Sequence, residues 1–462
     1  MKFSLKQLQA AIPSSVMTAD AEVTGLTTDS RHIKQGDLFV ALRGEHFDAH
    51  DFLKSVSLSG AVAVVAEQVP PGFALPAMIV SDTTLALQEI ARYWRSQFSI
   101  PVIGVTGSNG KTTVKEMIAS ILVAQSGAEH CLATSGNLNN EIGVPLTVLR
   151  LEKRHQCAVI ELGMNHPGEI MLLAAVAMPT VGLVNNAQRE HQEFMQNVDA
   201  VALENGAVLR SLPDDGIAIF PAHDTYTKLW RSIAGEFGQR KVLTFGLFEA
   251  DAENADVFAT YRANDFGSDI QINLDSSTFS VSLSAAGTHN VLNALAAVAC
   301  CHAIGISNEI IKRGLEAFEP VNGRLQRKTA KNGATIIDDT YNANPDSVRV
   351  AVDVLAQSAH ASILVLGDMG EVGSDGVAFH QEIGTYARER GIAQLLTMGN
   401  LAQHSALAFG AGAKHFEQIE TMQTALDDCI LPSSTVLIKG SRFMKMERLV
   451  TYLTKQQSTG NH

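Results

Sequence analysis

The sequence predicts an α/β protein of three domains. The chain has 462 residues, which is too long for one ordinary hydrophobic core. Short β-branched runs indicate buried strands, and several are followed by a polar loop and a helical pattern, an order typical of mostly parallel sheets. We place a small N-terminal α/β domain at residues 1–82, a central sheet domain at 83–319 and a Rossmann-like α/β domain at 320–462.

Composition restricts the class of protein. A hydrophobic fraction of 46% and a charged fraction of 18% are typical of a globular chain, and the net charge of -13 argues against a nucleic-acid surface. The five cysteines form no CxxC pair, so we expect free thiols and a cytoplasmic protein. The most apolar run, 171–184, is too short and interrupted to cross a bilayer. We expect no membrane anchor and a monomer.

The stretch from Pro101 to Glu116 carries the strongest signal for a ligand. A β-branched strand leads into a glycine-rich turn, and a helix then opens with a lysine and two threonines. Backbone N–H groups, a helix N-terminus, a lysine charge and a hydroxyl for Mg²⁺ meet the needs of bound ATP. The first glycine of the usual GxxxxGK[ST] pattern would fall at Val105, and the alternative is a mere glycine-rich turn. The predicted phosphate site comprises Gly107, Ser108, Asn109, Gly110, Lys111, Thr112 and Thr113.

The N-terminal domain has one informative segment, residues 27–53. Its loops combine Ser30, Arg31, Phe47 and His50, which would suit the hydroxyl, phosphate and base contacts of a sugar nucleotide. The alternative is an ordinary polar loop.

Further candidates follow successive strands of the central domain. The loop 134–145 holds a dense group of amides, of which we select Asn137 and Asn140 as ligand contacts. Glu161 ends the next strand, where a carboxylate can reach the metal of a bound nucleotide, and His191 follows a third strand. A lone histidine in a loop is often structural, so both roles stay open for His191.

The helix after a strand-rich insertion, residues 214–283, begins with Asn290 and Asn293, which would contact adenine or ribose. Helix capping by Thr288 or Asn290 is the alternative. In the last domain, polar residues follow predicted strands, where open parallel sheets bind ligands. We select Arg324, Asp339, Asn342, Asn344 and Arg442, the last with surface solvation as its alternative.

Several motifs together resemble the Mur ligases, ATP-dependent amide-forming enzymes of peptidoglycan precursor synthesis. They are TGSNGKTT, TSGNLNNEIGVP, ELGMNHPGEI, GTHNVLNALAA, NGRLQR, DDTYNANPDS and LGDMGEVG, and they follow the family's order along nearly the whole chain. The N-terminal TDSR and GDLFVALRGEHFDAHDF resemble the family's uridine-nucleotide-binding domain.

The resemblance implies an activity. DDTYNANPDS with LGDMGEVG is similar to members that join D-alanyl-D-alanine to UDP-MurNAc-tripeptide through an acyl phosphate, and the DNPR motif of the diaminopimelate-adding relative is absent. It implies that Lys111 holds the β- and γ-phosphates, and that Thr112 and Glu161 hold Mg²⁺ with His191 at a second metal. Asn137 and Asn140 would lie along the peptide substrate, Asn290, Arg324 and Asp339 along ATP, and Asn342, Asn344 and Arg442 near the dipeptide.

One position departs from the family pattern. Many members carry a carbamylated lysine about fourteen residues beyond the histidine, whereas this chain has Leu203, Glu204 and Asn205 there. We hypothesise that Glu204 supplies the missing carboxylate as a catalytic residue. The remaining alternatives for the whole chain are another Mur-type or folylpolyglutamate-type ligase, or a P-loop NTPase switch.

Overall fold

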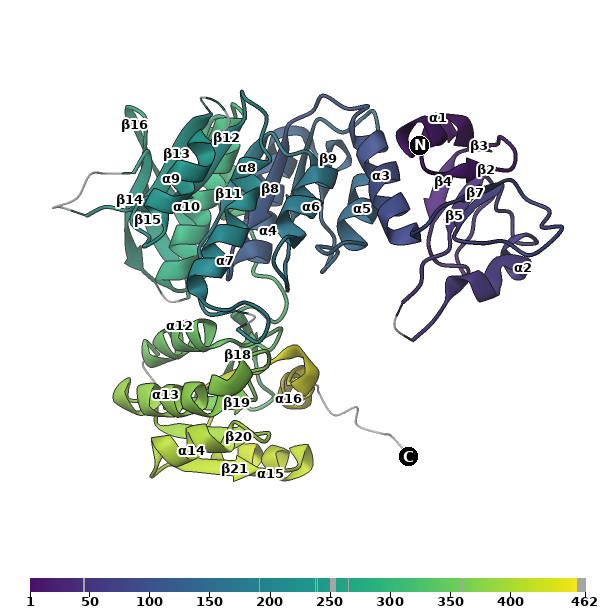
Figure 1. Ribbon diagram of the computed structural model, residues 1–462. Coiled ribbons are helices and arrows are strands. Elements are labelled where there is room, and N and C mark those ends of the chain that lie inside the picture. The colour runs from purple at the N-terminus through teal and green to yellow at the C-terminus, as the bar shows by residue number, and fades with distance from the viewer. Residues whose placement is uncertain are drawn as a thin grey trace, which may run out of the picture.

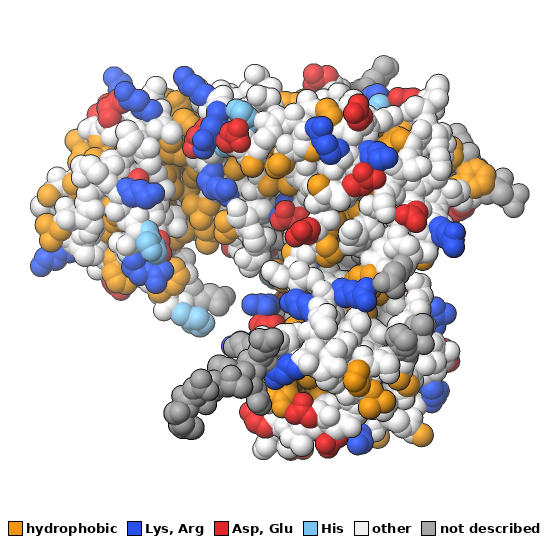
Figure 2. All heavy atoms as spheres, turned by 180° about the vertical axis from the view of Figure 1, so that it is seen from behind, with side chains coloured by type: hydrophobic (Ala, Val, Ile, Leu, Met, Phe, Trp, Pro, Cys, Tyr) orange, Lys and Arg blue, Asp and Glu red, His pale blue; other side chains and the backbone are white. Residues whose placement is uncertain are grey.

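The computed structural model describes residues 1–44, 46–190, 192–236, 238, 240–249, 255–264, 266–358 and 361–454. Figure 1 shows the three α/β domains, with the purple N-terminal domain at one end of the central domain and the green-to-yellow C-terminal domain against another side of it. Seen from behind, the two outer domains are separated by an open hollow (Figure 2). The predicted three-domain α/β fold is confirmed. In the part of the chain just given, no helix has the length and apolar character needed to span a membrane.

The N-terminal domain is built on a five-stranded sheet. Its strand order is β2-β7-β6-β5-β4, parallel except for β2, and two short strands, β1 and β3, pair separately. The elements are β1 (Phe3–Ser4), α1 (Leu5–Ala11), β2 (Val16–Met17), β3 (Glu22–Val23), β4 (Gly25–Thr27), β5 (Asp37–Val40), η1 (Ala49–Phe52), α2 (Leu53–Val56), β6 (Ala63–Ala66) and β7 (Ala77–Ile79).

The central domain contains a nine-stranded sheet in the order β16-β15-β14-β13-β12-β11-β8-β10-β9. Strands β8 to β14 are all parallel to one another. Strands β15 and β16 add two antiparallel pairings at one edge of the sheet. The strands are β8 (Val102–Thr106), β9 (Cys131–Ala133), β10 (Cys157–Glu161), β11 (Val181–Val184), β12 (Ile217–Pro221), β13 (Lys241–Leu247), β14 (Val257–Ala263), β15 (Ser268–Leu274) and β16 (Ser277–Leu283). The predicted insertion therefore extends the main sheet.

Helices cover both faces of this sheet because its strands are apolar on both sides. One core joins α3, α5, α6 and α8 to the sheet, and another joins α4, α10 and α11 to it. The helices are α3 (Thr83–Arg95), α4 (Lys111–Ser126), η2 (Ala128–His130), α5 (Gly143–Val148), α6 (Glu169–Ala177), α7 (Val198–Asn205), α8 (Ala207–Arg210), α9 (Thr227–Gly235), α10 (Thr288–Ala303) and α11 (Asn308–Glu316).

The C-terminal domain has a six-stranded sheet in the order β17-β18-β22-β19-β20-β21, parallel except for β17. Separate apolar cores fill its two faces. The elements are β17 (Gln326–Thr329), β18 (Thr335–Asp339), α12 (Pro345–Ala356), β19 (Ser362–Gly367), η3 (Gly373–Asp375), α13 (Gly376–Glu389), β20 (Gln394–Met398), α14 (Gln403–Phe409), β21 (Ala413–Phe416), α15 (Ile419–Cys429), β22 (Thr435–Lys439), η4 (Arg442–Met444) and α16 (Glu447–Thr454).

The proposed domain boundaries fall between elements. Residue 82 precedes α3, and residue 320 lies between α11 and β17. The first boundary is not a clean break in packing, because Phe3 contacts Trp94 of α3 with ring centroids 6.1 Å apart. The N-terminal domain therefore shares part of its core with the central domain.

Candidate active site

A cavity of about 870 Å³ lies at the junction of the central and C-terminal domains. It opens at the carboxyl ends of β8, β10 and β11. In the sheet β8 lies between β10 and β11, so the chain continues to both sides of β8, which is where open parallel sheets bind ligands. Of the predicted site residues, it is lined by Ser108, Asn109, Gly110, Lys111, Thr112, Thr113, Asn140, Glu161, Asn290, Asn293, Arg324, Asp339, Asn342 and Asn344. Predicted residues of the central and C-terminal domains thus meet at one place.

The glycine-rich loop is held by asparagines that leave the helix N-terminus open. Gly107 and Gly110 have φ of +134° and +82°, and a Cβ on Gly107 would lie 2.9 Å from Cβ of Asn185. Asn205 Oδ1 accepts the Gly107 N–H at 2.9 Å, and Asn186 Oδ1 accepts the Asn109 N–H at 2.9 Å. Helix α4 has no side-chain cap, so its first N–H groups can bind an anion.

Lys111 lies folded onto this loop. Its Nζ donates to the carbonyl oxygens of Gly107 and Ser108 and lies 3.3 Å from Glu190 Oε2. Glu190 is 6% exposed and was not selected from the sequence, although it stands next to the predicted His191. His191 itself lies outside the described residues.

Glu161 has one carboxylate oxygen engaged and one available. Its Oε1 accepts hydrogen bonds from Thr112 Oγ1 at 3.1 Å and from Asn139 Nδ2 at 2.8 Å. Its Oε2 is buried and has no hydrogen-bond partner within the described parts of the chain. A buried carboxylate oxygen beside a threonine hydroxyl is the oxygen donor set that Mg²⁺ prefers. Thr112 and Glu161 therefore fit a magnesium ion.

The C-terminal domain contributes positive charge to the same place. Arg324 NH2 donates to Thr112 Oγ1 at 2.9 Å, and its guanidinium carbon lies 4.2 Å from the centroid of the Tyr341 ring. Lys439 is 3% exposed and donates to Asp339 Oδ2 at 2.6 Å. Arg324 thus connects the last domain directly with Thr112 at the start of α4, beside the glycine-rich loop. The Asp339 carboxylate is paired with Lys439.

The start of α10 forms an amide chain toward the glycine-rich loop. Asn290 Nδ2 donates to Ala286 O, Asn293 Nδ2 donates to Asn290 Oδ1 at 3.1 Å, and Asn293 Oδ1 accepts from Asn185 at 2.9 Å. The N-cap is Gly287 without a side-chain hydrogen bond, so the capping alternative is wrong. Burial lowers the pKa of the neighbouring His289 to about 4.

Asn344 and Asn140 each accept a hydrogen bond from a backbone N–H three residues further along the chain. Asn344 Oδ1 caps α12 by accepting the Ser347 N–H at 2.8 Å, and its Nδ2 donates to Asn109 Oδ1 at 2.9 Å. Asn140 Oδ1 accepts the Gly143 N–H at 2.9 Å. Both residues still line the cavity, so their substrate contacts stay a prediction.

Several predicted residues lie away from the cavity lining. Asn137 is exposed and does not line the cavity, whereas Asn139, which was not selected, lines it and donates to Glu161 Oε1. Arg442 lies on η4 and pairs with Glu447 at 3.3 Å, with a side chain that is 67% exposed. This placement matches the alternative of a solvated surface charge.

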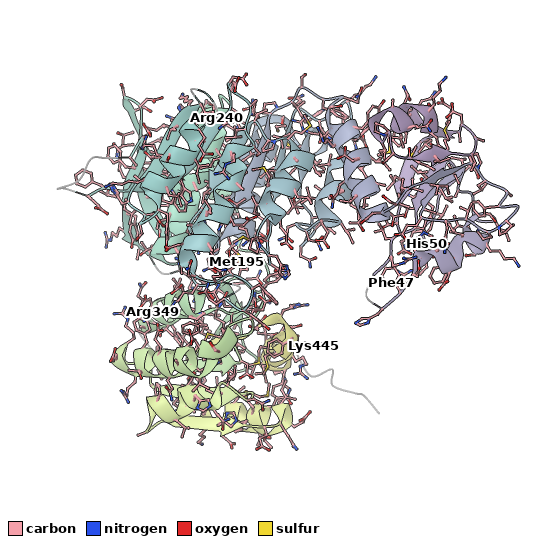
Figure 3. The ribbon with its side chains drawn as sticks, viewed as in Figure 1. Phe47, His50, Met195, Arg240, Arg349 and Lys445 are labelled. Carbon is pink, nitrogen blue, oxygen red and sulfur yellow. The ribbon has the colours of Figure 1, made fainter. Side chains whose placement is uncertain are left out.

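The predicted nucleotide residues of the N-terminal domain form a separate group. Phe47 is 59% exposed and, with His50, lies on the side of that domain facing the hollow (Figure 3). Both ring nitrogens of His50 are engaged, Nδ1 with Asp48 at 2.6 Å and Nε2 with the Glu67 N–H at 2.9 Å. Arg31, which follows Ser30, binds the Asp29 carboxylate through Nε and NH2.

Glu204 caps a helix in this structure. Its Oε2 accepts the Gly168 N–H and its Oε1 accepts the Ile170 N–H, both at 2.8 Å, at the start of α6. Its carboxylate is directed to α6, whereas the adjacent Asn205 is directed to the phosphate loop. The structure thus supplies no support for a metal ligand at Glu204.

This assignment predicts the behaviour of Glu204→Gln. Losing the charge and one acceptor should lower the free energy of unfolding by about 1 kcal/mol. The Mg²⁺ dependence of activity should not change. Thermal unfolding and a magnesium titration of activity check both points; a variant that needs more Mg²⁺ for half-maximal activity would restore the metal role.

Arg189, another residue not selected from the sequence, joins the central and C-terminal domains. It lies after β11, and its guanidinium binds Asp346 of α12 at 2.6 Å and Glu382 of α13 at 2.8 Å. Arg349 adds a second cation to Glu382 at 3.0 Å. Hydrogen bonding to Arg189 lowers the pKa of Glu382 below its ordinary value.

We expect Arg189→Gln to loosen the contact between these domains, because two carboxylates lose their shared partner. Small-angle scattering should show a larger radius of gyration than for Arg210→Gln, whose salt bridge with Glu236 stays within the central domain. The pKa of Glu382 is lower in the folded protein than in the unfolded chain. The stabilisation from its ion pair with Arg189 is therefore fully present at pH values above the usual pKa of glutamate, and it is lost as the pH falls through the lowered pKa. An unchanged radius in Arg189→Gln would contradict this role.

Comparison with known proteins relates nearly the whole chain to one family. Family models match residues 105–301 (Mur ligase middle domain), 323–442 (Mur ligase, glutamate ligase domain) and 22–95 (Mur ligase family, catalytic domain). The UDP-N-acetylmuramoyl-tripeptide–D-alanyl-D-alanine ligase of Escherichia coli is 39% identical, over 97% of this chain and 98% of that protein.

Solved structures agree with the sequence comparison. A crystal structure of MurF from Acinetobacter baumannii has a TM-score of 0.91 and 36% identity, covering 98% of this chain and 99% of that one. MurF ligase from Thermotoga maritima in complex with ADP has a TM-score of 0.83 and 26% identity, covering 93% and 97%.

Proposed function

The chain belongs to the Mur ligase family, and we propose that the cavity between its central and C-terminal domains is where ATP drives the ligation. The protein is a ligase of peptidoglycan precursor synthesis that adds D-alanyl-D-alanine to UDP-N-acetylmuramoyl-tripeptide. The observation that carries the assignment of the site is the convergence of Lys111, Thr112, Glu161 and Arg324 on that cavity.

Each of these side chains has a defined task in our proposal. The N–H groups at the start of α4 and the Lys111 ammonium bind the β- and γ-phosphates. Thr112 and Glu161 hold Mg²⁺, which neutralises phosphate charge when bound. Arg324 brings a guanidinium from the C-terminal domain to the phosphate oxygens, since it already contacts Thr112. The positive charges around the phosphates are therefore complete only when the central and C-terminal domains are in contact.

The reaction then proceeds in two steps. The free carboxylate of the tripeptide attacks the γ-phosphorus of ATP, and ADP leaves, giving an acyl phosphate. The amine of D-alanyl-D-alanine attacks the acyl carbon, loses a proton, and inorganic phosphate leaves as the amide forms. The residues around the cavity position the reactants and offset charge, which is how phosphoryl transfer is usually catalysed.

The N-terminal domain is proposed to bind the uridine nucleotide. Phe47 and His50 lie on its side facing the hollow, where the nucleotide end of a long substrate can bind while its peptide extends to the cavity. Asn140, Asn342 and Asn344 line the cavity and are proposed substrate contacts. We propose that the protein acts as a monomer in the cytoplasm.

Phosphate release from ATP with Mg²⁺ tests the function. The UDP-tripeptide and D-alanyl-D-alanine are added separately and then together, and the product is identified by mass spectrometry. We expect sustained release only with both acceptors, together with the UDP-pentapeptide. Equal release with neither acceptor would instead identify an NTPase switch.

A further inference from the structure

Two free cysteines face each other at the edge of the central sheet. Cys131 begins β9, the edge strand, and Cys157 begins β10, its parallel neighbour. They are register partners, and their sulfur atoms lie 3.7 Å apart, with the Cys157 thiol donating to the Cys131 sulfur. Neither residue lines the cavity or takes part in the proposed reaction.

The two thiols differ in exposure. Cys157 is 6% exposed, whereas Cys131 is only half-buried, with its sulfur 3.3 Å from Ser126 Oγ. The hydrogen bond from Cys157 lowers the pKa of the Cys131 thiol and raises that of Cys157. Cys131 is therefore the member of the pair that reaches the thiolate form and meets small solutes.

We propose that Cys131 and Cys157 form a site of reversible oxidation, which a peroxide closes to a disulfide. The Cys131 thiolate attacks one oxygen of hydrogen peroxide, which breaks the O–O bond, forms a sulfenic acid and releases hydroxide. The Cys157 sulfur then attacks the sulfenic sulfur, the S–O bond breaks, and hydroxide leaves with the Cys157 proton as water. Two thiols are oxidised by two electrons, and peroxide is reduced to water.

The backbone geometry permits this bond. Paired strands lie about 4.8 Å apart, and disulfides join Cα atoms about 4.4 to 6.8 Å apart. The sulfur atoms need to approach from 3.7 Å to about 2.05 Å, which requires side-chain rotation and a small movement of the edge strand. Such a bond between neighbouring strands is expected to be reduced readily by a dithiol.

The pair is connected to the nucleotide site through both strands. Strand β9 leads to Thr134, whose Oγ1 accepts the Glu161 N–H at 3.0 Å, and β10 ends at Glu161 itself. Drawing the starts of the strands together should displace this contact. Oxidation is therefore expected to slow ligation, a consequence that rests on the proposed role of Glu161.

Counting thiols tests the site independently of activity. After treatment with hydrogen peroxide and denaturation, the number of free thiols in the full chain should fall from five to three, and dithiothreitol should restore it. Cys131→Ser should keep its four thiols under the same treatment, because it lacks the thiolate that peroxide attacks. In Cys157→Ala the Cys131 sulfenic acid has no partner thiol, so one thiol should be lost and the mass should rise by oxygen without the loss of two hydrogens. Cys429→Ser, a control on α15, should still lose two.

Two results would overturn the proposal. One is a wild-type chain that keeps all five thiols or gains oxygen atoms in mass without losing two hydrogens. The other is Cys131→Ser losing two thiols like the wild type. Ligation measured on the same samples should fall on oxidation in the wild type and stay constant in Cys131→Ser; equal activity of the oxidised and reduced wild type would refute the link to Glu161.

Discussion

Glu161→Gln is expected to reduce kcat on the order of 10³-fold, because magnesium supplies several kcal/mol of charge stabilisation in phosphoryl transfer. Gln retains the size of the side chain and an acceptor for Thr112 and Asn139, but loses the charge at the buried Oε2. The fold should therefore persist while magnesium binding is lost. Steady-state rates over a magnesium series measure the effect.

The matched control is Glu129→Gln, an exposed residue of η2 away from the cavity lining. It should keep the wild-type rate and magnesium dependence. ADP binding without magnesium should also be similar in Glu161→Gln and the wild type, since the phosphate loop is intact. A Glu161→Gln enzyme with the wild-type magnesium dependence would contradict the assigned metal site.

Lys111→Ala is expected to lower kcat/KM for ATP by roughly 10²- to 10³-fold, the cost of removing one preorganised donor to a developing charge. The Lys111 ammonium faces the loop carbonyls and Glu190, so it needs only a small movement to reach the phosphates. Unlike Glu161→Gln, this variant should bind ADP more weakly even without magnesium.

Calorimetric titration with ADP distinguishes the two variants. Lys153→Ala, which removes an exposed lysine, serves as the control and should bind ADP like the wild type. Wild-type ADP affinity and turnover in Lys111→Ala would show that the ammonium does not contact the phosphates.

The sequence predicted the placement of those residues whose position follows from local chain geometry. Lys111 and Thr112 open a helix directly after a strand and a glycine turn, and Glu161 ends the neighbouring strand. Such positions are determined by alternation along the strand and by the helix start, so the residue pattern alone places all three at one sheet edge. The three-domain α/β fold followed from the same patterns.

Loop residues could not be chosen in the same way. In the loop 134–145, Asn139 lines the cavity and the selected Asn137 does not, because the direction of each side chain depends on the turn conformation. At the position of the family lysine, Glu204 caps α6 while Asn205 binds the phosphate loop. One residue along a helix rotates a side chain by about 100°, so composition alone cannot select between them.

Contacts between distant parts of the chain could not be predicted from the sequence either. Arg189 is a charged residue whose partners, Asp346 and Glu382, lie far away along the chain. Nothing in a local pattern indicates that Arg189 binds Asp346 and Glu382 rather than solvent. These pairs form only when the strands and domains are packed together.

The most direct measurement of the central claim follows an oxygen atom. The tripeptide carboxylate is labelled with ¹⁸O, and the inorganic phosphate formed with ATP and D-alanyl-D-alanine is analysed by mass spectrometry. If this site activates the carboxylate as an acyl phosphate, each UDP-pentapeptide formed is accompanied by one phosphate that carries the label. Unlabelled phosphate accompanying the same product would show that the carboxylate is never phosphorylated and would contradict the account.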